Sequence, residues 1–178
     1  FCAEDLIKND VIVCYGDIAY SPEVLEALVA SPHDITVVVD ANWKEYWSAR
    51  FQNPLDDAES LSIDEDGFIS NIGQKAATIE EIQGQYIGLM RFKGKGLSNL
   101  VSEYQRADRS QRLGERPIDS AYMTDMLQHL IDGGQKIFAL ETNSPWVEVD
   151  TVEDFEAEYT QERLRAIEGK LAASRENR

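Results

Sequence analysis

The sequence predicts an α/β fold in which helices flank a parallel sheet. Two apolar runs of strand length, residues 10–15 and 35–39, lie on either side of a segment that begins with Ser21-Pro22. Runs that are apolar throughout are typical of strands buried on both faces. Serine is a preferred N-cap and proline is favoured in the first helical turn, so a helix is expected between the runs. This order predicts a βαβ unit.

The rest of the chain supplies further elements of both kinds. The patterns predict a β-hairpin at 59–63 and 67–72, strands at 84–92 and 136–140, and a helix at 122–131. Thr151 and Asp154 form a Thr-x-x-Asp capping box that opens a final helix. Residues 1–172 are therefore expected to form one domain, and residues 173–178 a polar tail.

Composition narrows the classes of partner. The net charge of −16 argues against a nucleic-acid backbone or an anionic membrane surface as the partner. No apolar run is long enough to cross a membrane. The two cysteines, Cys2 and Cys14, show no metal-ligand spacing and indicate no disulfide framework, so a cytoplasmic location is expected.

The first residues, Phe1 to Leu6, contain neither an initiator methionine nor the basic segment of a signal peptide. They are typical of the middle of a helix that leads into a central strand. We therefore expect this chain to be part of a longer one. If a neighbouring strand belongs to the preceding part, residues 11–15 form an exposed apolar edge here, and such an edge favours self-association.

Asp17 and Asp150 are candidate metal ligands, because each follows a short apolar strand and precedes a loop or a helix start. If both strands point the same way in one sheet, the two carboxylates converge beyond the strand ends, where open α/β sheets bind ligands. Two carboxylates together with phosphate and water suit Mg²⁺, which prefers oxygen ligands. The alternative is that Gly16-Asp17 only makes a turn and Asp150 only favours the helix N-terminus that follows it.

An aromatic stripe follows the second strand. Trp43, Tyr46 and Trp47 recur at helical spacing, which is more typical of a core than of a binding site. The alternative is that one or two of these rings line a substrate pocket and face a cation, because Trp and Tyr are the best cation–π partners. Both interpretations stay open at this point.

The segment from Arg106 to Pro117 is a charged stretch without a clear secondary-structure pattern. It contains four arginines in an otherwise acidic protein: Arg106, Arg109, Arg112 and Arg116. A solvated loop is the favoured interpretation. A mobile lid that contacts phosphate is the alternative.

Four segments together resemble the sugar-nucleotidyltransferase superfamily. In chain order they are Val11-Ile-Val-Cys-Tyr-Gly-Asp-Ile18, Ile82-Gln-Gly-Gln-Tyr-Ile-Gly-Leu89, Ala121-Tyr-Met-Thr-Asp-Met-Leu-Gln128 and Trp146-Val-Glu-Val-Asp-Thr151. Within the superfamily, the chain is most similar to the cytidylyltransferases that activate phosphocholine or 2-aminoethylphosphonate. The resemblance covers nearly the whole chain up to the last helix. It implies a partial nucleotidyltransferase domain with a Rossmann-like mixed, mostly parallel sheet flanked by helices.

The resemblance implies Mg²⁺-dependent transfer of a nucleotidyl group, with CTP as donor, a small amine-bearing phosphate or phosphonate as acceptor, and pyrophosphate as product. By match to the family motifs, Asp17 and Asp150 would be the metal ligands and Lys75 would contact the acceptor phosphate. The residues expected in the acceptor pocket are Gln85, Tyr86, Gly88, Asp125, Trp146, Asp40, Trp43 and Tyr46.

The sequence departs from the family in one respect. The glycine-rich loop that binds the triphosphate and the base in the family is absent, since no Gly-x-Gly-x-x-Arg segment occurs here. The chain thus carries the acceptor side and the metal ligands without the nucleotide cradle. Two alternatives stay open: a non-catalytic binding or interaction domain of the same fold, and a metal-dependent glycosyltransferase. The second fits less well, because no Asp-x-Asp follows Val13.

Overall fold

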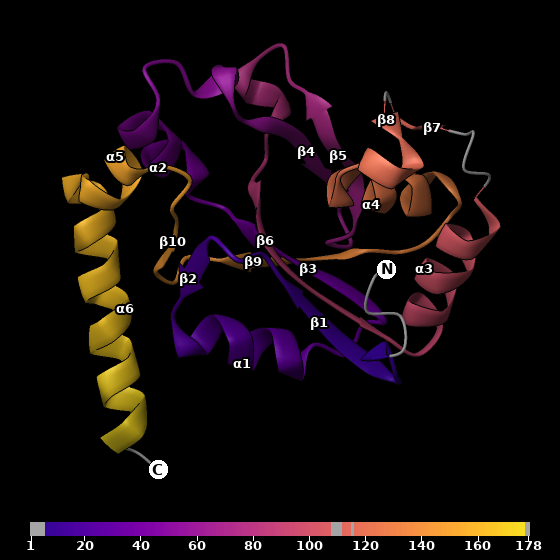
Figure 1. Cartoon of the computed structure of the whole chain (residues 1–178), viewed down its shortest axis with the longest axis horizontal. Helices are drawn as coiled ribbons and strands as arrows, with labels where there is room; N and C mark the ends of the chain where they lie inside the picture. The colour runs from indigo at the N-terminus through magenta and orange to yellow at the C-terminus, as the bar shows by residue number, and fades with distance from the viewer. Residues whose placement is uncertain (1–5, 108–111, 115, 177–178) are drawn as a thin grey trace.

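The computed structural model describes residues 6–107, 112–114 and 116–176. A four-stranded sheet lies at its centre (Figure 1). In spatial order its strands are β1 (Asp10–Cys14), β6 (Gln85–Lys93), β3 (Ile35–Asp40) and β9 (Phe138–Thr142). The described residues also form three two-stranded pairs: β2 (Ile18–Tyr20) with β10 (Trp146–Glu148), β4 (Glu59–Ile63) with β5 (Ile69–Lys75), and β7 (Arg112–Leu113) with β8 (Arg116–Pro117).

Helices surround these strands on several sides (Figure 1). The α-helices are α1 (Pro22–Ala30), α2 (Trp43–Arg50), α3 (Gly94–Arg106), α4 (Met123–Asp132), α5 (Val152–Glu156) and α6 (Glu158–Glu176), and the 3₁₀ turns are η2 (Pro54–Asp56), η3 (Ile79–Glu81) and η4 (Ile118–Ser120). α4 packs against β5, whereas α6 packs against β10 and α1. Among the described helices, none combines the length and the apolar composition that a membrane span requires.

The central sheet is mixed, as predicted, but the prediction that it is mostly parallel is wrong. β6 runs antiparallel to both of its neighbours, β1 and β3, whereas β3 and β9 are parallel. β1 and β3 therefore point the same way, as a βαβ unit requires, but β6 lies between them. An apolar run does not reveal this, because a central strand buries both faces whatever the direction of its neighbours.

β1 is an edge strand, and the expectation that it is buried on both faces is wrong. Within the described chain it pairs with β6 alone, and its side chains alternate between exposed and half-buried. Ile12 is 39% exposed, whereas all six residues of β3 are buried. Self-association through this exposed edge stays a prediction.

The core has two parts, one on each face of the central sheet. Val37 and Val39 pack into one part with Leu127 of α4, and Val38 packs into the other with Trp146. This alternation follows from the two-residue period of a strand. Trp43, Tyr46 and Trp47 all belong to the second part, so the aromatic stripe is core, as its spacing favoured.

The predicted final helix is divided in two. Thr151 caps α5 as expected, because its hydroxyl oxygen accepts a hydrogen bond from the amide of Asp154 at 3.0 Å. Ala157 is extended, however, and the side chain of Gln161 donates to the carbonyl of Phe155, so the backbone of α5 does not continue into α6. α6 reaches Glu176, and the division into residues 1–172 and a tail stays a prediction.

Candidate functional site

The β2–β10 pair brings distant acidic residues together. Glu148 lies opposite Ile18, and the amide of Val149 donates to the carbonyl of Asp17 at 2.9 Å. Because an antiparallel pair places the start of one strand beside the end of the other, Asp17 lies beside Glu148 and Asp150. The two aspartates expected to converge do so, but through an antiparallel pair and not through parallel strand ends.

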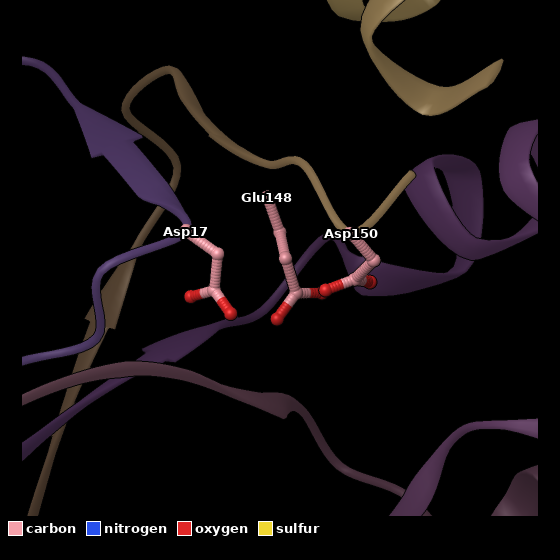
Figure 2. A group of neighbouring side chains, drawn as sticks. All are labelled: Asp17, Glu148 and Asp150. Carbon is pink, nitrogen blue, oxygen red and sulfur yellow. The ribbon is translucent and has the colours of Figure 1, made fainter. Parts of the chain in front are cut away.

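Asp17, Glu148 and Asp150 form what we call the carboxylate cluster. One side-chain oxygen from each of them lies within 4.8 Å of the others. Figure 2 shows the carboxyl group of Glu148 between those of the two aspartates. Both aspartates are exposed and Glu148 is half-buried. Oxygen donors of this kind at this separation fit a small, hard divalent cation.

Glu148 is absent from the residues predicted for this site. A signal for it exists, because residues i and i+2 of an extended segment face the same side, and Glu148 precedes Asp150 by two. Burial raises the pKa of Glu148, a hydrogen bond from Arg50 opposes that rise, and the negative charges of Asp150 and Asp17 add to it. A cation at this position therefore stabilises the ionised carboxylate.

Arg50, which was not predicted either, is the cation that contacts this cluster from within the protein. Its Nη1 donates to Oε2 of Glu148 at 2.6 Å, and its Nη2 donates to Oδ2 of Asp150 at 2.5 Å. Its Nε lies 3.5 Å from Oδ1 of Asp154. The arginine side chain is 2% exposed. Burial is the largest single effect and opposes the charged form, but the hydrogen bonds to Glu148 and Asp150 and the charge of Glu148 act together against it, so the pKa of Arg50 is raised.

Tyr46 holds the backbone of Glu148. Its hydroxyl accepts a hydrogen bond from the Glu148 amide at 2.9 Å and lies 3.2 Å from the Glu148 carbonyl, to which it donates. Burial raises the pKa of Tyr46 to about 12, so the phenol keeps its proton at neutral pH. The guanidinium carbons of Arg50 and Arg163 lie 5.4 and 4.0 Å from the centre of its ring. The cations that face this ring are thus arginines of the same chain.

Asp40 and the tryptophans lie next to this arrangement in the core. The Asp40 carboxylate, 3% exposed, accepts hydrogen bonds from the Asn42 amide and from Nε1 of Trp146, each at 2.8 Å. Trp43 and Trp146 are each 1% exposed. Asp40 and Tyr46 also line a cleft of about 370 Å³ beside α2 and α6. Contact of these residues with an acceptor stays a prediction.

The residues of β6 that were predicted to line the acceptor pocket make contacts with other residues of the chain. The Gln85 side chain accepts from the Glu59 amide at 3.1 Å and donates to the Glu59 carbonyl at 2.6 Å. Gly88 has a φ of +80°, and a Cβ there would lie 2.7 Å from the ring of Tyr15. Tyr86 packs edge-to-face on Tyr15, and burial raises its pKa. The group that approaches the backbone of Gly88 closely is therefore a ring of the same protein.

Lys75 and Asp125 share a cleft of about 680 Å³, which we call the Lys75 cleft. Its charged lining residues are Lys75, Arg116, Asp56, Asp57, Glu59 and Asp125. Lys75 is exposed at the end of β5. Asp125 accepts a hydrogen bond from the Tyr122 amide at 2.8 Å and so caps α4, while Arg116 stacks 3.8 Å above the ring of Tyr122.

The four arginines of the charged stretch are distributed over different elements. Arg106 ends α3, Arg112 lies in β7 and Arg116 in β8, whereas Arg109 is outside the described residues. Arg116 alone of the three described arginines lines the Lys75 cleft. Of the described arginines, Arg116 is therefore the one that could contact a phosphate in this cleft. The choice between a solvated loop and a phosphate-contacting lid stays open.

Tyr15 lies within electrostatic range of both regions. Burial raises its pKa most, and the negative charges of Glu59 in the Lys75 cleft and of Asp17 and Glu148 in the carboxylate cluster raise it further. A hydrogen bond with Tyr86 acts in the opposite direction. Acidic residues of both regions thus act on the same phenol.

Comparison with known proteins shows what the chain is similar to. No family model matches the chain. The chain is 36% identical over 164 residues to the CTP:phosphoglutamine cytidylyltransferase of Campylobacter jejuni, an alignment that covers 89% of this chain and 64% of that enzyme. The chain therefore spans slightly less than two thirds of that relative's length.

Solved structures share the fold. The inositol-1-phosphate CTP transferase of T. maritima superposes with a TM-score of 0.63 at 16% identity, over 94% of this chain and 62% of that one. A Bacillus anthracis protein described as a glucose-1-phosphate thymidylyltransferase superposes with a TM-score of 0.62 at 14% identity, over 95% and 58% of the two chains. The chain is thus similar in sequence to a cytidylyltransferase and similar in fold to nucleotidyltransferases.

Proposed function

We propose that this chain forms the metal-binding and acceptor-binding part of a cytidylyltransferase. The reaction would transfer a cytidylyl group from CTP to a small phosphorylated acceptor and release pyrophosphate. The observation that carries the proposal is the carboxylate cluster, in which Asp17, Glu148 and Asp150 meet. The similarity to a CTP:phosphoglutamine cytidylyltransferase supports CTP as the donor and a phosphorylated small molecule as the acceptor.

Mg²⁺ is the metal we propose for the carboxylate cluster. The cluster offers only carboxylate oxygens, which suit this hard ion better than a soft one. Asp17, Glu148 and Asp150 would hold it. When bound, the ion would neutralise phosphate charge and orient the phosphates for displacement.

The acceptor supplies its own nucleophile. A phosphate or phosphonate oxygen is ionised at neutral pH, so the reaction requires no side-chain base and depends on positioning and charge stabilisation. The new bond joins this oxygen to the α-phosphorus of CTP, and the bond from that phosphorus to the β-phosphate oxygen breaks. Lys75 would hold the acceptor phosphate through its ammonium group. Asp125 and Glu59, in the same cleft, would attract a cationic group of the acceptor.

The remaining predicted residues receive a supporting role in this proposal. Gln85, Tyr86 and Gly88 shape the wall between the two regions, and Trp146, Asp40, Trp43 and Tyr46 support the carboxylate cluster from the core. We further propose that residues 1–172 act as one domain in the cytoplasm, with neither nucleic acid nor membrane as a partner, in line with the acidic composition.

The test is pyrophosphate release by the full-length protein with CTP and Mg²⁺. The acceptor panel contains phosphocholine, 2-aminoethylphosphonate and phosphoglutamine. Release is expected with at least one of them, and EDTA should abolish it. No release with any of the three would contradict the proposal. Metal binding without release would instead favour a non-catalytic binding domain, and hydrolysis of a UDP-sugar would favour a glycosyltransferase.

A further inference from the structure

Arg50 lies in the last turn of α2, with its guanidinium beneath the carboxylate cluster. We propose that Arg50 is the positioning residue of this metal centre, which holds the carboxylates of Glu148 and Asp150 in place beside Asp17. The inference rests on the proposed function, because it assumes that the cluster binds a divalent cation. It assigns to Arg50 an effect on metal affinity and no contact with the substrate.

Arg50 forms a hydrogen bond with one oxygen of each of two carboxylates and leaves the other oxygen of each available. Arg50 takes Oε2 of Glu148 at 2.6 Å and Oδ2 of Asp150 at 2.5 Å, each with a different terminal nitrogen. Oε1 of Glu148 and Oδ1 of Asp150 receive no hydrogen bond from it in the described structure. The planar fork of an arginine can bridge two carboxylates in this way, whereas the point charge of a lysine ammonium cannot fix both.

Arg50 can hold its partners because it is itself held. Its guanidinium carbon lies 5.4 Å from the ring centre of Tyr46, 5.9 Å from that of Trp47 and 5.2 Å from that of Phe51. The side chain is 2% exposed, so few other rotamers are open to it. Asp154 lies 3.5 Å from Nε on the remaining side. Aromatic rings and a third carboxylate thus fix the cation in one orientation.

Glu148 is consequently fixed at both ends. Tyr46 binds its backbone amide and carbonyl, and Arg50 binds its carboxylate. Mutation of side chains that orient metal ligands in this way typically lowers metal affinity or activity by about 10- to 100-fold. Asp17 lacks such a contact among the described residues and is exposed, so Arg50 acts on the β10 side of the cluster.

Electrostatics alone makes the opposite prediction for Arg50. The like charges of neighbouring carboxylates repel one another, so the cluster is stabilised by a nearby cation. The same positive charge repels a divalent ion. If Arg50 were only a counter-charge, its removal would tighten metal binding. If it is a positioning residue, its removal weakens metal binding.

The experiment measures Mn²⁺ binding to the full chain by electron paramagnetic resonance of the free ion. The wild type is compared with Arg50→Met, which removes the charge, and with Arg50→Lys, which keeps the charge but not the fork. We expect both variants to bind Mn²⁺ roughly 10-fold more weakly or worse, the usual effect of losing such a contact. Circular dichroism establishes that each variant is folded, and Arg50→Lys keeps the test valid if Arg50→Met does not fold.

Arg163→Met is the matched control. Arg163 packs on the same Tyr46 ring at 4.0 Å and donates to the Trp146 carbonyl at 3.1 Å. Its described contacts do not include the carboxylate cluster. Arg163→Met should therefore lower the stability of the protein and leave the Mn²⁺ dissociation constant within about twofold of the wild type, the ordinary scatter for a site without a lost ligand contact.

Each outcome decides between the two roles. Equal or tighter Mn²⁺ binding by a folded Arg50 variant overturns the inference while the proposed function stands. An equal weakening in Arg163→Met also overturns it, because loss of aromatic packing would then suffice. A wild type that does not bind Mn²⁺ overturns the proposed metal centre and the inference together. Weaker binding in both Arg50 variants and not in Arg163→Met supports the positioning role.

Discussion

The carboxylate cluster and the Lys75 cleft differ in how firmly their side chains are held. Around the cluster, Arg50 and Tyr46 are buried and bind Glu148 through its carboxylate and its backbone. In the cleft, Lys75 is exposed at a strand end and Arg116 rests on an exposed ring. A rigid cluster suits a metal, which requires fixed ligand positions, and exposed side chains suit an acceptor that differs between relatives.

The two regions also differ in charge. The cluster consists of carboxylates, and among the described residues Arg50 is the buried cation that contacts them. The Lys75 cleft, in contrast, is lined by side chains of both signs. A site with one sign of charge selects for charge and size. A site with both signs selects for the spacing of charges in the ligand. Under the proposed function, this difference would allow metal binding and acceptor choice to be changed separately.

The largest expected effect comes from breaking the cluster itself. Asp17→Asn and Asp150→Asn keep the shape of each side chain and remove its charge, so pyrophosphate release should fall by roughly 10²-fold or more. Glu156→Gln, an exposed acidic residue of α5, is the control and should leave the rate unchanged. A rate in either Asp variant close to that of the wild type would remove the cluster from the mechanism.

The rigidity of the cluster predicts the next effect. Tyr46→Phe removes the hydroxyl that bonds the amide and carbonyl of Glu148, which should lower the free energy of unfolding by about 1–3 kcal/mol. Tyr122→Phe, on the rim of the Lys75 cleft and 53% exposed, should change it by less than about 0.5 kcal/mol. Urea unfolding measures both. Equal effects would show that the two regions are equally rigid.

Lys75 tests the adaptable side. Lys75→Ala should raise the acceptor KM about 10-fold, because it removes the ammonium group proposed to hold the acceptor phosphate. A tenfold change corresponds to about 1.4 kcal/mol of binding free energy. Stability should change by less than about 0.5 kcal/mol, since the side chain is exposed. Lys44→Ala, an exposed lysine of α2, is the matched control. An unchanged KM would place the acceptor phosphate elsewhere.

The smallest effect concerns pH. Burial raises the pKa of Glu59 in the Lys75 cleft, and the charges of Asp125 and Asp57 add to the rise. As the pH falls, a carboxyl group with a raised pKa takes up its proton in the folded protein before it does so in the unfolded chain. The free energy of unfolding should therefore increase as the pH falls towards the pKa of Glu59 in the unfolded chain. Glu59→Gln should remove this increase and raise stability slightly at pH 7. Thermal unfolding of the wild type and of Glu59→Gln is measured from about pH 4, near the ordinary pKa of a glutamate, to about pH 8. If the pKa of Glu59 is not raised, the difference in stability between the two proteins will not change with pH.

Sequence patterns predicted most strands and helices, because apolar runs and caps are local signals. Ser21-Pro22 starts α1, and Thr151 caps α5, as their residue types indicate. The direction of β6 could not be predicted in this way. Its pairing with β1 and β3 depends on which distant strands it meets, and an apolar strand fits either direction.

The candidate site was predictable in part. Asp17 and Asp150 each follow an apolar strand, which is a typical position for a metal ligand, so both could be predicted. Glu148 has only the weaker signal of its i, i+2 spacing to Asp150, and Arg50 has none. Arg50 ends a helix in an acidic protein, and only its position in the folded chain shows that its partners lie on β10 and just after it. Ion pairs between distant segments leave no periodic trace in the sequence.

The pairing of β2 with β10 has a consequence for the order of folding. Arg50 and Asp150 are 100 residues apart in the sequence, and Tyr46 and Glu148 are 102 apart. Contacts that close such long loops form slowly, because the chain loses entropy before the contact is made. During synthesis, the carboxylates cannot meet until β10 has left the ribosome. Under the proposed function, metal binding would begin only after β10 has been synthesised, and metal uptake would report the pairing of β2 with β10.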